Sequence, residues 1–277
     1  MKKLSLLLTL LLIVFSISGC SNQATSTDDS STAKALIDEV EKEYKNDKIQ
    51  YYSKNNEWTY NVYSNFVELL TYSGLDQDLI IPASLEGLPV RILGNKCFSL
   101  MTGTTLKLKT VHIPENIAIV GENCFGGQYE LTSVSIDSTS KGISFKSGAF
   151  YNCKKLTDES VDIILKLTFN TVPSSMFEGC STITKITIPA NISEINNRAF
   201  SCESISYFDF GMVSKIDNPL GFYCNTIETI YIRNNKCEIT KLAERLNDGN
   251  FIIYGNKDST AEKYAAQNRI IFKEITQ

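Results

Sequence analysis

The fold is decided by residues 176–200, which read Met-Phe-Glu-Gly-Cys-Ser-Thr-Ile-Thr-Lys-Ile-Thr-Ile-Pro-Ala-Asn-Ile-Ser-Glu-Ile-Asn-Asn-Arg-Ala-Phe. This stretch begins and ends on equivalent phenylalanines, Phe177 and Phe200, which are 23 residues apart. Between them lie a cysteine, a run of alternating isoleucines, a proline and a second apolar pair. Self-similarity at a period of about 20 to 30 residues indicates a solenoid, because one unit cannot bury its apolar face without stacked neighbours.

Degenerate copies of this unit extend over most of the chain. The phenylalanines that align are Phe98, Phe125, Phe150, Phe177, Phe200 and Phe222. Each is followed by a candidate strand, at residues 108–113, 131–136, 161–163, 183–188, 205–210 and 227–232. In the well-matched copies a proline such as Pro189 follows the strand, and it ends the ladder because it has no N–H to donate.

The full pattern, Ala-Phe-x-x-Cys-x-x-Leu-x-x-Val-x-Ile-Pro-x-x-Val-x-x-Ile-Gly, resembles the BspA-like leucine-rich repeat family. The matching segments are 120–121, 149–156 and 183–189, with a family-like entry at 86–90 and a family-like terminal helix at 259–265. We therefore predict a mainly β leucine-rich repeat solenoid over residues 51–277. About six repeats, over residues 90–232, would form one curved parallel β-sheet with short turns on its convex side.

Both ends of the solenoid have candidate caps, residues 51–89 and 233–277. Residues 58–70 alternate and then turn near 63–65, which predicts a β-hairpin. At the other end a strand at 251–255 precedes a helix that Ser259 and Glu262 would begin with a capping box, followed by an extended segment at 270–272. Such caps are needed because terminal repeats otherwise expose apolar core and unpaired strand edges.

The N-terminus has the features of a lipoprotein signal peptide, residues 1–20. Lys2 and Lys3 precede an apolar stretch at 4–17, which is shorter than the roughly 20 helical residues needed to span a bilayer. Ile17-Ser18-Gly19-Cys20 resembles a bacterial lipobox, which implies cleavage before Cys20 and lipidation of its sulfur. The alternative is an ordinary signal peptide that ends in cysteine. We expect an extracytoplasmic protein held to the bacterial envelope by this lipid.

Two short segments connect the anchor to the repeats. Residues 21–32 contain no large apolar side chain and are expected to form a flexible tether. Residues 33–50 are expected to contain a short helix, because Leu36, Ile37, Val40 and Tyr44 recur at helical spacing.

Charge and residue usage exclude several functions. The chain has 27 basic and 31 acidic residues and a formal charge of −4, and without a basic stripe it is a poor candidate for nucleic-acid binding. Its one histidine, His112, lies at an exposed strand position, whereas catalytic triads and most zinc sites need histidine with partners. We expect a monomer without catalytic activity, metal or other cofactor.

The cysteines recur with the repeat at Cys153, Cys180, Cys202 and Cys224. At these positions they are expected to be small buried hydrophobes. Because neighbouring rungs are about 4.8 Å apart, a Cys202–Cys224 disulfide also satisfies the Cα separation of about 4.4–6.8 Å. We favour buried thiols, and the disulfide remains an alternative.

The family resemblance implies binding, specifically attachment of the cell surface to proteins or other cells. We expect a protein or glycan ligand at the sheet face; the alternatives are a carbohydrate-binding or hydrolysing envelope protein and a purely structural one. The candidate ligand-binding residues, which would project from three neighbouring strands, are Lys185, Tyr207, Asp209, Tyr231 and Arg233. Aromatic and arginine side chains dominate binding hot spots, although exposed strands also favour tyrosine by propensity alone.

Overall fold

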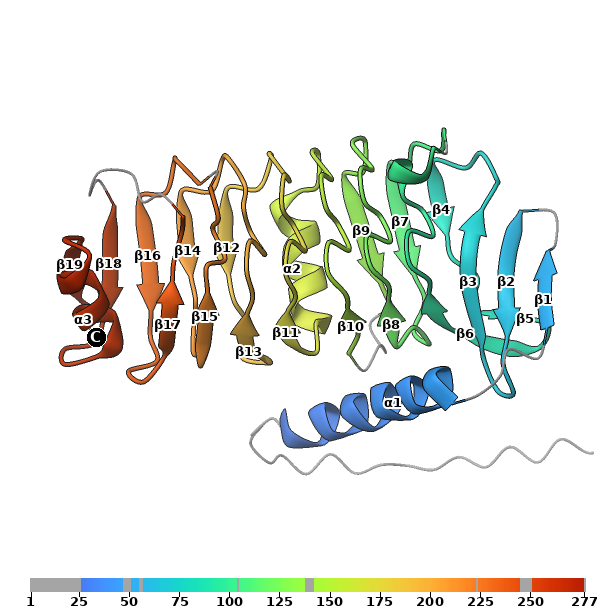
Figure 1. The fold of residues 1–277 in the computed structure, drawn as a ribbon, viewed down its shortest axis with the longest axis horizontal. Helices are drawn as coiled ribbons and strands as arrows, with labels where there is room; N and C mark the ends of the chain where they lie inside the picture. Colours follow the sequence, from blue (N-terminus) through green and yellow to red (C-terminus); the bar gives the residue numbers. More distant parts are fainter. Residues whose placement is uncertain are drawn as a thin grey trace, which may run out of the picture.

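The computed structural model describes residues 26–46, 51–54, 57–103, 105–137, 142–222, 224–244 and 251–276. The expected signal peptide, its lipobox and Cys20 lie outside these residues. Within them the chain forms one elongated array of stacked turns, with the N-terminal strands at one end and the C-terminal helix at the other (Figure 1).

Successive turns contribute strands to two faces of the array. The strands of the first face, here called the front face, are β4 (Asp78–Ile80), β7 (Thr110–Ile113), β9 (Ser133–Ile136), β12 (Lys185–Thr187), β14 (Tyr207–Asp209), β16 (Thr229–Ile232), β18 (Ile252–Gly255) and β19 (Ile271–Glu274). Those of the back face are β6 (Leu88–Leu93), β8 (Ile119–Val120), β10 (Ser144–Phe145), β11 (Asn170–Val172), β13 (Ile192–Ile195), β15 (Lys215–Asp217) and β17 (Glu238–Lys241). All paired neighbours within these two faces are parallel. The predicted parallel repeat fold is confirmed, but segments expected to be only turns form a second sheet.

A stack of phenylalanines fills the space between the two faces. The rings of Phe98, Phe125, Phe150, Phe177 and Phe200 follow one another at centroid distances of 5.1, 5.2, 5.7 and 5.4 Å, and each ring is at most 1% exposed. Two residues before each ring the backbone has a positive φ, at Lys96, Asn123, Gly148, Ser175 and Arg198. This left-handed residue turns each rung inward.

The sixth position of the stack belongs to Leu220 and not to Phe222. Asn218, two residues before Leu220, has the positive φ of 49°, and Leu220 is fully buried whereas Phe222 is 47% exposed. The alignment of Phe222 with the other phenylalanines was therefore wrong. Residue type alone cannot distinguish these two apolar residues, because the left-handed turn that selects one of them lies upstream.

The seven cysteines of the described residues are free and buried. Four of them donate from Sγ to the carbonyl of the phenylalanine one rung earlier, as in Cys180 to Phe150 O (3.2 Å) and Cys202 to Phe177 O (3.0 Å). Burial raises the pKa of Cys180 and of Cys224 to about 12. The structure supports the buried-thiol interpretation over a Cys202–Cys224 disulfide.

A helix, α2 (Asp158–Leu167), replaces the strand expected at residues 161–163. Val161, Ile164 and Leu165 are fully buried at helical spacing, and the Thr157 hydroxyl caps the helix by accepting from Ser160 N. The helix lies between β9 and β12 in the row of the front face (Figure 1). The strand expectation was wrong because the apolar alternation of Val161 and Ile163 over such a short window does not separate a strand from a segment of buried helix.

Side chains of α2 satisfy the strand edges that it interrupts. The Ser160 hydroxyl accepts from Val134 N on β9, and the Asp158 carboxylate accepts from Thr184 N just before β12. Beyond the helix, Asn191 Nδ2 donates to the carbonyls of Leu165 and Thr168. The front face is thus divided into a three-strand part, β4-β7-β9, and a five-strand part, β12-β14-β16-β18-β19.

Within the expected bounds 51–89, the N-terminal cap contains more strands than the predicted hairpin. The predicted hairpin forms from β2 (Trp58–Val62) and β3 (Val67–Tyr72), and β1 (Tyr51–Lys54) pairs with β2 on the other side. The hairpin continues into the back face, because β3 pairs with β6 in parallel. A two-residue strand, β5 (Ser84–Leu85), returns antiparallel on β6, and a short 3-10 helix spans Leu100–Thr102.

The N-terminal helix, α1 (Ser26–Asn46), begins inside the segment expected to be a flexible tether. Its residues Ile37 and Val40 pack against Phe66, Ile92 and Ile119 of the cap and back face, and Figure 1 shows it lying alongside these strands. The helix was expected to begin only after Thr32, because its first turns carry few apolar residues. Ala33, which is 2% exposed, gives only a weak signal in the sequence.

The C-terminal cap has the predicted strand, helix and final extended segment, but the predicted capping box is only half formed, because Ser259 N donates to Asn256 O and not to Glu262. The helix α3 (Thr260–Gln267) has Ser259 as N-cap, accepting from Glu262 N, while the Glu262 carboxylate accepts from Asp258 N. The final strand β19 then pairs in parallel with β18. Ala261 and Ala265 are fully buried against the last turn of the array.

Candidate functional site

Three half-buried tyrosines form a stack on the outward side of the five-strand part of the front face. They are Tyr207 on β14, Tyr231 on β16 and Tyr254 on β18, and we call them the tyrosine ladder. The ring centroids of Tyr207 and Tyr231 are 5.6 Å apart, and those of Tyr231 and Tyr254 are 4.7 Å apart with an interplanar angle of 14°. The ladder follows from the register, because Tyr231 pairs with Tyr254, and Tyr207 lies one diagonal position away opposite Thr229.

Buried residues hold the ladder in place. Strand residues alternate between the two sides of a sheet, so Phe208, Ile230 and Ile253 lie beneath the tyrosines, and all three are fully buried. The rings are therefore supported by a packed core and by each other. A surface of this kind offers large contact areas at a low cost in conformational entropy.

Three cations surround the ladder. Lys185 Nζ lies 4.9 Å from the centroid of the Tyr207 ring. Arg233 Cζ lies 5.0 Å from the Tyr231 ring and Lys273 Nζ lies 6.0 Å from the Tyr254 ring. A cation within about 6 Å of an aromatic face is attracted by the ring quadrupole, so each ring is paired with one positive charge.

Asp209 is engaged by its neighbours and does not project freely. Its side chain is 7% exposed, and Arg233 donates to both of its oxygens, with Nη2 to Oδ2 at 2.6 Å. Gly211 N adds a third donor at 2.9 Å from Oδ1. The hydrogen bond to Asp209 raises the pKa of Arg233, while partial burial and then the Asp209 carboxylate raise the pKa of Tyr207. Asp209 orients Arg233 over Tyr231 and neutralises one of the three cations.

The structure brings the five predicted residues together and adds two that the sequence analysis missed. Lys185, Tyr207, Tyr231 and Arg233 lie on the exposed side as expected, whereas Asp209 is buried. Tyr254 and Lys273 complete the row, since Tyr254 pairs with Lys273 across β18 and β19. The alternation of 251–255 contained the signal for Tyr254, but its register to β16 could not be read across the intervening segment.

A second polar row lies on β7 and β9, where His112 has two partners that the sequence analysis did not assign. His112 Nδ1 is 3.0 Å from Ser135 Oγ, and His112 Nε2 is 3.3 Å from Asp137 Oδ1. Two N–H groups close to Ser135 are already engaged and cannot form an oxyanion hole: Val134 N donates to the Ser160 hydroxyl, and Asp137 N donates to Ile113 O. These three residues are exposed or half-buried on a flat strand surface, so acyl transfer is not supported.

Metal binding and membrane spanning find no support in the part of the chain that the structure describes. No group of three or more histidine, cysteine, aspartate or glutamate side chains is arranged there to hold a metal ion. Among those residues there is also no helix with the length and apolar character needed to cross a bilayer.

Comparison with known proteins identifies the repeat. The family model for the BspA type leucine rich repeat region matches residues 78–163 and 143–243, with six copies. A leucine rich cell surface protein from Faecalibacterium prausnitzii A2-165 is similar in structure, with 20% identity and a TM-score of 0.50 over 66% of this chain and 55% of that one. A leucine rich repeat protein from T. pallidum has 14% identity and a TM-score of 0.47, over 81% of this chain and 98% of that one.

The similarities cover only part of the proteins compared. This chain spans just over half the length of the F. prausnitzii protein. No curated protein matches the sequence. At these identities the solved structures bear on the fold alone, and the matched repeats contain the whole tyrosine ladder except Tyr254.

Proposed function

The chain belongs to the BspA-type leucine-rich repeat family, and we propose that it is a lipid-anchored protein of the bacterial cell surface that binds a protein or glycan ligand without chemical conversion. The observation that carries the binding proposal is the tyrosine ladder with its three cations. Aromatic rings supply contact area and the arginine supplies directed hydrogen bonds, which are the features of binding hot spots.

The charges around the ladder favour an acidic ligand. Lys185, Arg233 and Lys273 flank the rings, and among the described residues Arg233 is the one of these three that forms an ion pair, with the buried Asp209. The chain as a whole has a formal charge of −4, so this cationic and aromatic surface differs in sign from the protein that carries it. A ligand with carboxylate or other anionic groups beside apolar surface would complement it.

The anchor proposal rests on the sequence. Cys20 and the lipobox lie outside the described residues, and the first helix that the structure describes begins at Ser26 and packs on the back face. With a lipid at Cys20, the tyrosine ladder on the front face is carried by a rigid array close to the bilayer. A surface location also agrees with the description of the F. prausnitzii protein.

The binding proposal is tested by probing arrays of host matrix proteins and of glycans with the processed protein, and by repeating the assay with Lys185→Glu and Lys273→Glu combined. We expect an acidic ligand whose binding weakens by at least about tenfold in this variant and decreases with salt, because both lysines lie beside rings of the tyrosine ladder. A matched control is Lys107→Glu with Lys109→Glu, which makes the same charge change on two exposed lysines just before β7, in the three-strand part of the front face. Equal loss in both variants would show that overall charge and not the ladder determines binding.

A further inference from the structure

The tyrosine ladder and its three cations form one row that crosses five parallel strands. In order across the sheet these strands are β12, β14, β16, β18 and β19 (Figure 1). Lys185 lies on the first strand and Lys273 on the last, while Arg233 lies beside Tyr231, the ring on the middle strand. Because neighbouring strands are about 4.8 Å apart, the strands of the two lysines are about 19 Å apart. The middle strand is about 10 Å from each of them.

The rings of the ladder present their edges and hydroxyl groups, and not their faces, to a ligand. Tyr231 lies between Tyr207 and Tyr254, at centroid distances of 5.6 and 4.7 Å. A lysine ammonium lies over each end ring, at 4.9 Å for Tyr207 and 6.0 Å for Tyr254. A sugar or a proline that stacks on an aromatic ring needs an open face. The row therefore binds through phenol hydroxyls and cations, which select a ligand rich in oxygen acceptors.

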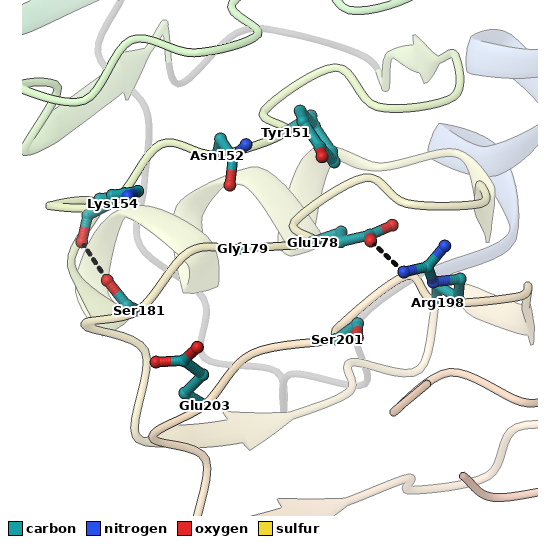
Figure 2. Close-up of a pocket in the computed structure, with 9 residues that line it drawn as sticks. All are labelled: Tyr151, Asn152, Lys154, Glu178, Gly179, Ser181, Arg198, Ser201 and Glu203. Carbon is teal, nitrogen blue, oxygen red and sulfur yellow. Dashed lines mark hydrogen bonds and ion pairs between the residues drawn. The ribbon is translucent and has the colours of Figure 1, made fainter. Parts of the chain in front are cut away.

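The row lies on a strand surface and not in a cavity. Lys185 and Lys273 are exposed, and the three tyrosines between them are half-buried on the outward side of the sheet. The polar cavity of about 460 Å³ shown in Figure 2 lies among the turns around Tyr151, Glu178 and Ser201, and no residue of the ladder lines it. A ligand that reaches all three cations is therefore an extended chain that lies across the strands.

The spacing of the cations separates the classes of extended ligand. In an extended peptide every second side chain points the same way, so acidic groups recur at about 6.7 Å and lose register with cations about 10 Å apart. A polyproline II peptide repeats at about 9.3 Å, but such peptides dock on open aromatic surfaces, and the ring faces are covered here. In a linear polysaccharide each sugar unit advances by about one strand spacing. A carboxylate on every second sugar then meets each cation in turn, with sugar hydroxyls beside the tyrosine hydroxyls.

We propose that the tyrosine ladder binds a linear acidic polysaccharide that has a carboxylate on every second sugar and lies across the strands. This inference rests on the binding function proposed for the ladder and names its ligand class. The Asp209 carboxylate does not oppose such a ligand, because its side chain is 7% exposed and is paired with Arg233. The Arg233 side chain is itself 41% exposed, so it remains accessible from the outward side.

The test is calorimetry on the processed protein with hyaluronan oligosaccharides, in which uronate alternates with N-acetylglucosamine. We expect the affinity to rise by at least about tenfold from the disaccharide to the hexasaccharide, because one carboxylate becomes three, and then to level off. Chitohexaose has the same number of sugars without carboxylates and should not bind. A hexaglutamate peptide carries more charge at the wrong spacing and should bind more weakly than the hexasaccharide.

Two variants separate the spacing of the cations from overall charge. Lys185→Gln with Lys273→Gln should weaken hexasaccharide binding by at least about tenfold, whereas the control, Lys107→Gln with Lys109→Gln, removes the same charge from the three-strand part and should not. Thr229→Lys with Lys273→Thr keeps the net charge but moves one cation from β19 to β16, where Thr229 is half-buried on the outward side. We expect a similar loss of affinity, with little change in melting temperature because these are surface substitutions.

The inference is overturned if the hexasaccharide binds no better than the disaccharide or the glutamate peptide, or if moving the cation leaves its affinity unchanged. An array ligand that depends on Lys185 and Lys273, in the absence of hexasaccharide binding, would also overturn it and leave the proposed binding function standing. If neither an array ligand nor the hexasaccharide depends on these lysines, both the inference and the proposed function are wrong.

Discussion

Replacing Phe150 by alanine should destabilise the array far more than replacing Phe222. The sequence treats these phenylalanines as equivalent, but Phe150 is fully buried between Phe125 and Phe177, at 5.2 and 5.7 Å, whereas Phe222 is 47% exposed. A buried Phe→Ala substitution costs about 3–5 kcal/mol, and loss of two ring contacts places Phe150 in the upper half of that range. Phe222 is half-buried and its ring lies 5.9 Å from Arg198 Cζ, so its removal should cost about 1 kcal/mol.

The assay is urea denaturation of the mature protein followed by far-ultraviolet circular dichroism. With a urea m-value of about 3 kcal/mol/M, a loss of about 4 kcal/mol lowers the midpoint by about 1.3 M, and a loss of about 1 kcal/mol lowers it by about 0.3 M. Phe222→Ala thus serves as the matched control. Similar midpoints for the two variants would refute the assignment of Leu220, and not Phe222, to the sixth position of the stack.

Three further outcomes follow from the anchor, the thiols and the C-terminal cap. Cys20→Ala should leave an unlipidated, unprocessed precursor, and recovery of membrane-free, unmodified protein from wild-type cells would contradict the anchor. Iodoacetamide at pH 8 should label the seven cysteines only after denaturation, because burial raises their pKa. Since the cysteine pKa values in the folded protein lie above those in the unfolded chain, the free energy of unfolding should fall as pH rises from about 8.5 toward 12. Deleting Asp258–Gln277 exposes an edge of β18 and should cause aggregation, and a monomeric truncation with an unchanged melting temperature would show that the cap is dispensable.

Much of the fold could be predicted because each repeat places the same residue types at the same positions. The phenylalanine, cysteine and alternating isoleucines of residues 176–200 located five front strands and the inward side chains beneath the tyrosines. The prediction failed where the length of a repeat or of its turn differs from that of its neighbours. Residues 158–167 form a helix inside a longer repeat, and Leu220 displaces Phe222 because the last turn is set by the left-handed Asn218.

The candidate site could be predicted only in part, because it depends on register between strands. Tyr207, Tyr231, Lys185 and Arg233 were found from alternation within strands that the repeat already aligned. Tyr254 and Lys273 were missed because the strands that carry them lie beyond the last clear repeat. The burial of Asp209 also could not be read from alternation, since it results from the Arg233 side chain folding back over the strand end.

The affinity of the Tyr207→Ser, Tyr231→Ser double variant for the ligand identified on the arrays tests the central claim most directly. Both positions are on the exposed side of strands whose inward residues are unchanged, so the melting temperature should move little. We predict a loss of binding of more than about tenfold, with Tyr129→Ser as the control, because Tyr129 is a more exposed tyrosine (45%) that lies on a turn and not in the ladder. Unchanged affinity in the folded double variant would contradict the assignment of ligand binding to the tyrosine ladder.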